Sequence, residues 1–113
     1  MMMERMRGTL RTYALEASDP AEVLRRVDRK IQHFEPGELA TVQYAVIDRG
    51  LGRAYISSAG HLPPVLAVPG KPATLADITP GPVIGLDLDA PRHVTTIEIL
   101  PGSVLCFYMS VVK

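Results

Sequence analysis

Several features that would assign this chain to a particular class of protein are scarce. A single cysteine, Cys106, cannot form an internal disulfide, which favours a reducing, cytosolic compartment. Lys plus Arg and Asp plus Glu each number 12, so the net charge is zero and no overall attraction to nucleic acid or anionic lipid is expected. No apolar run approaches the roughly 18 residues that a membrane span needs. The opening residues, 1–5, lack the apolar core of a signal peptide. We therefore expect a soluble, cytoplasmic protein.

The composition is that of a folded chain. Apolar residues make up 47% of the sequence and charged residues 21%, which is typical of globular rather than disordered proteins. At 113 residues the chain is one domain or less. A domain near this size buries roughly two-thirds of its unfolded surface, so a sizeable core is expected.

Two amphipathic helices are predicted in the first third of the chain. Apolar residues recur at helical spacing over 2–17. A second helix starts at Asp19-Pro20, where aspartate can cap and proline suits the first helical position, and Glu22 can complete a capping box. This helix ends at Pro36-Gly37. Its predicted buried face comprises Val23, Leu24, Val27, Ile31 and Phe34, and its solvated face comprises Arg25, Arg26, Asp28, Arg29 and Lys30.

Beyond residue 40 the apolar period changes to two, which predicts β-strands. The first two strands pair antiparallel, because the turn over 48–52 is far too short for a parallel crossover. Glycine and proline between 78 and 90 predict an ordered loop that covers part of the fold. The predicted fold class is α+β, with two helices packed on an antiparallel sheet. The predicted strands span 41–47, 53–59, 65–68, 73–75, 94–100 and 103–108, the last two forming a hairpin around Pro101-Gly102.

Between the second and third strands lies the most distinctive stretch, which contains Ala59, Gly60, His61, Pro63 and Pro64. Glycine can take backbone angles closed to other residues. Each proline removes a backbone donor and restricts the residue before it. The sequence therefore predicts a rigid corner between two strands, with His61 at its tip.

His61 has two interpretations. A histidine with a pKa near neutrality could donate a proton beside a phosphate. Alternatively, its ring hydrogen-bonds the backbone and fixes the corner. We favour the second, because no acid, second histidine or cysteine lies at catalytic spacing.

Other polar groups give weaker signals. Asp77, Asp87 and Asp89 share one loop, but their spacing does not match an EF-hand and fits ordinary loop chemistry better. The basic residues of the second helix are diluted by acidic neighbours and lack an aromatic platform, so a solvated helix face is favoured over a nucleic-acid contact.

A series of motifs occurs in one order along nearly the whole chain. The set is Asp19-Pro20 with Leu24, Ala40-Thr41, Ser58-Ala59-Gly60-His61 with Pro63-Pro64, Gly81 with Gly85-Leu86, Pro101-Gly102, and Leu105-Cys106-Phe107-Tyr108. Each motif alone is weak, and the ordered set is strong. Together they resemble the SpoIIE/RsbU branch of the metal-dependent (PPM, protein phosphatase 2C-like) serine/threonine phosphatases.

The resemblance implies a fold and a chemistry that this chain carries only in part. Such domains are α-β-β-α sandwiches in which aspartates hold two Mn²⁺ or Mg²⁺ ions, and a bridging water attacks phosphorus. The first family aspartates lie upstream of the first helix, and another follows the last strand, where this sequence has Ser110. A serine hydroxyl is a poor ligand for these cations. We expect residues 1–113 to be a partial domain that lacks the N-terminal metal-binding strands and the C-terminal Asp-Gly motif. No catalytic or metal-ligating residue is therefore predicted.

The resemblance also implies partners. The family substrate is a phosphorylated anti-anti-sigma factor, the output is control of stress or developmental transcription, and a sensor domain is expected in the parent chain. We predict that this chain is inactive on its own. A non-catalytic, phosphatase-like interaction module is the alternative.

Self-association is a further expectation. Several strands carry apolar residues on both faces, which an antiparallel sheet with one wet face would not show. The uncovered face and an unpaired strand edge would then recruit a second copy. The candidate contacts are Val46, Ile56, Leu66, Ile97 and Leu105.

Overall fold

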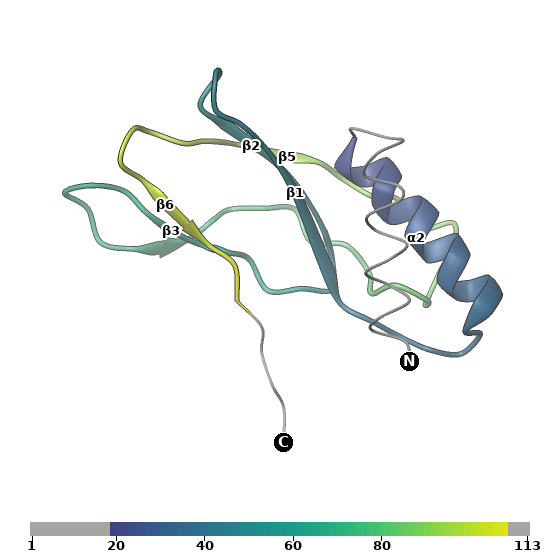
Figure 1. Ribbon diagram of the computed structural model, residues 1–113. Helices are drawn as coiled ribbons and strands as arrows, with labels where there is room; N and C mark the ends of the chain where they lie inside the picture. Colours follow the sequence, from purple (N-terminus) through teal and green to yellow (C-terminus); the bar gives the residue numbers. More distant parts are fainter. Residues whose placement is uncertain (1–18, 109–113) are drawn as a thin grey trace.

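The computed structural model describes residues 19–108 as one helix and two small antiparallel sheets, an α+β arrangement (Figure 1). The helix predicted over 2–17 and the position of Ser110 lie outside the described residues. The elements are α2 (Pro20–Phe34), β1 (Val42–Asp48), β2 (Arg53–Ala59), β3 (Val65–Ala67), β4 (Thr74–Leu75), β5 (Thr95–Glu98) and β6 (Val104–Cys106).

Helix α2 begins where the sequence predicts. Asp19 is the N-cap, and its carboxylate accepts a hydrogen bond from Ala21 N at 3.0 Å, which satisfies one of the otherwise unpaired amides of the first turn. The Glu22 carboxylate accepts from the Arg25 and Arg26 side chains at 2.9 and 3.0 Å. These bonds, that from Arg25 foremost, lower the pKa of Glu22.

Two assignments on α2 were wrong. Phe34, predicted to be buried, is exposed at the end of the helix. Asp28, predicted to lie on the solvated face, is buried. Asp28 lies four residues after Leu24 and three before Ile31, so helical geometry places it on the core face.

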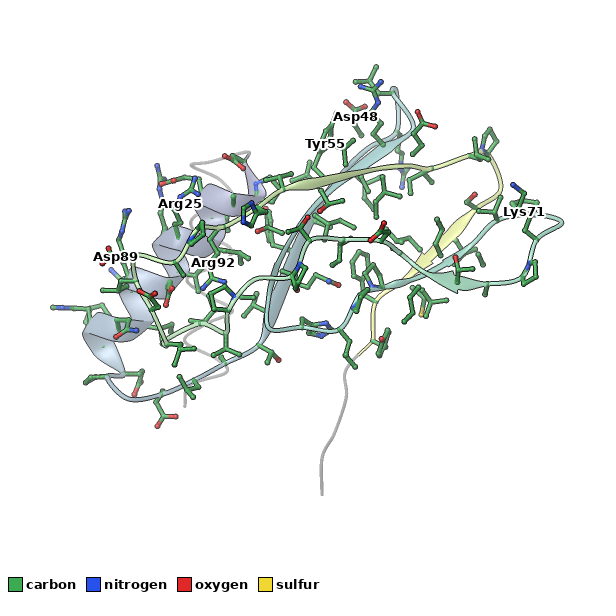
Figure 2. All side chains as sticks on the ribbon, turned by 180° about the vertical axis from the view of Figure 1, so that it is seen from behind. Arg25, Asp48, Tyr55, Lys71, Asp89 and Arg92 are labelled. Atoms are coloured by element: carbon green, nitrogen blue, oxygen red, sulfur yellow. The ribbon has the colours of Figure 1, made fainter. Side chains whose placement is uncertain are left out.

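The six strands form two three-stranded sheets, in the orders β1-β2-β5 and β4-β3-β6, where a single sheet was expected. Figures 1 and 2 place α2 and the second sheet on opposite sides of the first. The two sheets share no strand, and the chain crosses between them after β2, after β4 and after β5.

The predicted hairpin around Pro101-Gly102 is also wrong. A turn does form there, with Ser103 N donating to Leu100 O at 3.0 Å, but the strands on either side join different sheets. β5 pairs with β2, which sets Ile97 opposite Ala54. β6 pairs with β3, which sets Leu105 opposite Leu66. β5 and β6 thus each pair with a strand that is distant in the sequence, and not with each other.

The core lies between α2 and the first sheet. Its cluster comprises Val23, Leu24, Val27 and Ile31 from α2 with Val42, Ala59 and Ile84. The β1-β2 register places Val42 and Ala59 on the same sheet face, because directly paired residues in antiparallel strands point the same way.

The opposite face of this sheet is apolar as well, as predicted. Ile47 pairs with Ala54 and Ala45 with Ile56, so these side chains share the face away from α2. Ala54 and Ile56 are buried, whereas Ile47 is 54% exposed. The predicted contact residue Ile56 is therefore inaccessible to a partner. No helix within residues 19–108 has the length and apolarity to cross a membrane.

Candidate functional site

The corner predicted after β2 carries the chain from the first sheet to the second. β2 ends at Ala59, Gly60 adopts φ +69°, and β3 starts at Val65. Ser58 Oγ donates to His61 O at 3.1 Å, and Ala76 N donates to Pro64 O at 2.8 Å. Pro64 is buried, and Pro63 is half-buried. The corner, residues 59–64, is thus held by bonds on both sides.

The His61 side chain lies against its own backbone. Its Nδ1 lies 2.8 Å from Leu62 O, a carbonyl that also accepts from Gln43 Nε2 at 3.3 Å. The imidazole stands edge-on to the Tyr108 ring, with 6.3 Å between centroids. Within residues 19–108 no carboxylate or second histidine hydrogen-bonds to His61. The contact with Leu62 O is the ring-to-backbone hydrogen bond that the corner-fixing interpretation predicts.

A second segment, residues 81–85, runs across the corner, and we call it the covering segment. Gly60 N donates to Gly81 O at 2.7 Å. Ile84 and Ala40 exchange two backbone hydrogen bonds, at 2.8 and 3.1 Å, and Ile84 is fully buried. A Cβ at Gly60 would overlap the Val83 side chain. The ordered, covering loop predicted between 78 and 90 is therefore confirmed.

Asp28 and Arg92 hydrogen-bond to the covering segment from the helix side, and neither contact was predicted from the sequence. Arg92 Nη2 lies 3.1 Å from Asp28 Oδ2, with the two side chains 1% and 3% exposed. Asp28 Oδ1 accepts from Gly85 N at 2.7 Å. The Arg92 guanidinium donates to Pro82 O and, at 3.4 Å, to Val83 O. In the sequence, only the helical spacing of Asp28 from Leu24 and Ile31 indicated that Asp28 is buried. Nothing in the sequence indicated the role of Arg92.

The loop aspartates do not converge on a metal site. Asp77, Asp87 and Asp89 are exposed, and Asp87 Oδ1 accepts from the Asp89 amide at 2.9 Å in a local turn. Residues 19–108 contain no group of three or more His, Cys, Asp or Glu side chains placed to hold a metal ion. The buried carboxylate of Asp28 is already engaged by Arg92 and Gly85. The described donor set therefore does not fit a divalent cation.

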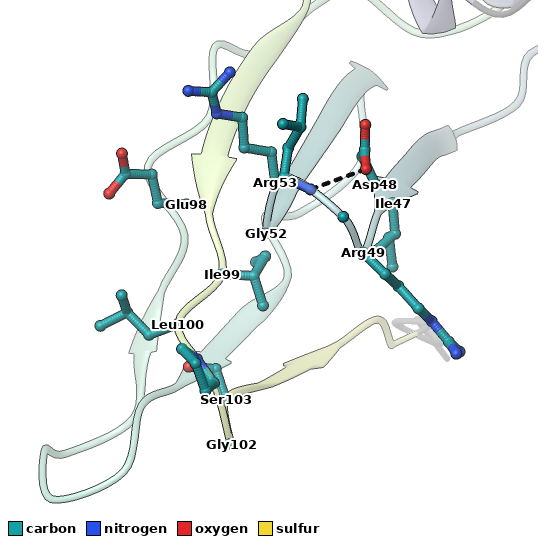
Figure 3. A pocket seen from close by; sticks show the side chains of 13 residues that line it. Ile47, Asp48, Arg49, Gly52, Arg53, Glu98, Ile99, Leu100, Gly102 and Ser103 are labelled. Atoms are coloured by element: carbon teal, nitrogen blue, oxygen red, sulfur yellow. Dashed lines mark hydrogen bonds between the residues drawn. The ribbon is translucent and has the colours of Figure 1, made fainter.

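An open cleft of about 680 Å³ lies at the other end of the first sheet, between the β1-β2 turn and residues 98–103 (Figure 3). Leu51 N donates to Asp48 Oδ1 at 3.1 Å in its wall. The lining of the cleft contains two arginines and two carboxylates, so its net charge is zero. The charge of the cleft therefore does not favour one class of ligand. The charged lining residues are Asp48, Arg49, Arg53 and Glu98.

These features define an α+β domain organised around a bonded proline corner and its covering segment. The chain belongs to the SpoIIE family: the family model described as Stage II sporulation protein E (SpoIIE) matches residues 1–108. Membership implies a PPM-type serine/threonine phosphatase domain, in a family that depends on metal ions. A search of curated proteins gave no match.

Proposed function

We propose that this chain is part of a protein serine/threonine phosphatase that dephosphorylates a phosphorylated anti-anti-sigma factor in sigma-factor regulation. The family match over residues 1–108 carries the proposal. The ordered corner supports it, because that motif is the most distinctive element shared with the family. A phosphoserine protein is thus the proposed substrate class, and a sensor domain of the parent chain is a proposed partner.

A non-catalytic, phosphatase-like interaction module is the second candidate. One observation favours it for the 113-residue chain: the described residues supply no metal-binding group, and their buried carboxylate is bonded to an arginine. Phosphoester hydrolysis in this family needs metal-activated water. The two candidates differ in one measurable property, which is metal-dependent release of phosphate.

We expect the 113-residue chain to show no phosphatase turnover with Mn²⁺ or Mg²⁺. The measurement is phosphate release from a phosphoserine protein, together with calorimetric titration of Mn²⁺, with an active metal-dependent phosphatase as positive control. No release and no tight Mn²⁺ site would favour the interaction module for this chain. Robust turnover, or two tight Mn²⁺ sites, would contradict the expectation of inactivity.

We also propose that copies of the chain associate through their exposed apolar surface. Ile47 on the face away from α2 is 54% exposed, and Val104 on β6 is 60% exposed. Contiguous exposed apolar surface favours association with another chain. Because Ile56 is buried, exposed neighbours such as Ile47 replace it as the candidate contact.

Sedimentation equilibrium at high micromolar concentration tests this association. We expect a mass above the 12.3 kDa of one chain, reduced toward that value by Ile47→Lys. Leu86→Lys is the matched control, since Leu86 is similarly exposed but lies beside the covering segment. A clean wild-type monomer that binds no apolar dye would rule the association out.

A further inference from the structure

One buried carboxylate contacts both ends of a short exposed loop. Asp28 Oδ1 accepts from Gly85 N, and Asp28 Oδ2 pairs with Arg92. Between these two anchors the loop turns at Asp87, whose carbonyl accepts from Ala90 N at 3.3 Å. Figure 2 shows Arg92 on the chain segment that runs along α2. A single side chain of the helix thereby closes the loop over 86–91.

The same pair adds to the hydrogen bonds that hold the covering segment. Gly81 O accepts from the corner at Gly60 N, and Ile84 bonds to Ala40 through both its backbone groups. Arg92 donates to the carbonyls of residues 82 and 83, and Asp28 accepts from the amide of residue 85. Four residues from separate parts of the chain therefore hydrogen-bond to the covering segment. They are Ala40, Gly60, Asp28 and Arg92, and the last two also form an ion pair with each other.

We propose that Asp28 and Arg92 are positioning residues that set the covering segment against the corner. Neither side chain hydrogen-bonds to Gly60, so their effect on the corner passes through Gly81–Gly85. With a charge-assisted bond at each end, the segment is held more firmly than neutral loop contacts would hold it. Without the pair, the carbonyls of Pro82 and Val83 lose their donor, and the segment opens locally while the β1-β2 ladder stays formed.

Amide hydrogen exchange measured by NMR on the whole chain tests this proposal. The variant is Asp28→Leu/Arg92→Met, because replacing a buried ion pair by apolar side chains of similar volume removes the charges without leaving one unpaired. We expect protection of the Gly60 and Ile84 amides to fall by about tenfold or more relative to the amides of β1 and β2. Gly60 is the informative reporter, since neither substituted side chain hydrogen-bonds to it.

Glu22→Gln is the matched control. It removes the half-buried ion pairs with Arg25 and Arg26 on the same helix, and we expect exchange at Gly60 and Ile84 to stay unchanged. Wild-type protection at these two amides in the double variant would overturn the proposal. So would a loss shared equally by β1 and β2, or failure of the double variant to fold, because the ion pair would then act on the stability of the whole domain.

Discussion

Gly85→Ala is expected to destabilise the domain by about 3 kcal/mol or more, from left-handed strain and overpacking together. Gly85 has φ +93°, a conformation that L side chains rarely adopt, and its added Cβ would overlap the backbone carbonyl of Glu38. The carbonyl cannot rotate away as a flexible side chain would. Relief requires moving Gly85, whose amide is bonded to the buried Asp28. Urea denaturation followed by far-UV circular dichroism measures the loss.

Gly37→Ala separates the two causes. Gly37 has φ +87°, close to that of Gly85, but nothing lies within 4 Å of the added Cβ. The control therefore carries only the backbone strain, about 1–2 kcal/mol. Equal losses from the two substitutions would show that the contact with Glu38 is relieved without cost, and that the covering segment is held less tightly than its hydrogen bonds indicate.

Arg92→Met is expected to lower the free energy of unfolding by about 3–5 kcal/mol, the usual result of removing one partner from a buried ion pair. The Asp28 carboxylate, whose side chain is 3% exposed in the folded chain, would lose its countercharge. The carbonyls of Pro82 and Val83 would also lose their donor. Adding Asp28→Asn should recover the part of the loss that comes from the unpaired charge, because the amide is neutral and its oxygen can still accept from Gly85 N. Chemical denaturation of the single and double variants measures both effects.

Arg25→Met is the comparison for the second prediction. Arg25 pairs with Glu22 at 2.9 Å, but its side chain is 35% exposed, and exposed ion pairs contribute little because water and salt screen them. We expect the free energy of unfolding to change little. If Arg92→Met were as mild as Arg25→Met, or if Asp28→Asn failed to restore stability, the buried pair would not carry the energy assigned to it.

Local chemistry accounts for much of what could be predicted at the site. The Gly60 conformation and the break at Pro63-Pro64 follow from residues that are adjacent in the chain. The contact of His61 with Leu62 O is likewise local. The covering segment was predictable as an ordered loop from its glycines and prolines. Its partner Asp28 was not, because a buried aspartate on a helix needs a countercharge, and that countercharge lies 64 residues further along the chain.

By itself, the sequence determined the start of α2 at Asp19-Pro20, the β1-β2 hairpin and the proline corner, since each depends on side-chain period or backbone restriction within a few residues. The tertiary structure alone decided the partners of β5 and β6. A short strand after a turn can pair with its neighbour or with a distant edge, and the alternation of apolar residues along β5 and β6 is compatible with either choice. The tertiary structure also decided that Asp28 faces the core. Only the fold brings Arg92 and Gly85 N to this carboxylate, which would otherwise be too costly to bury.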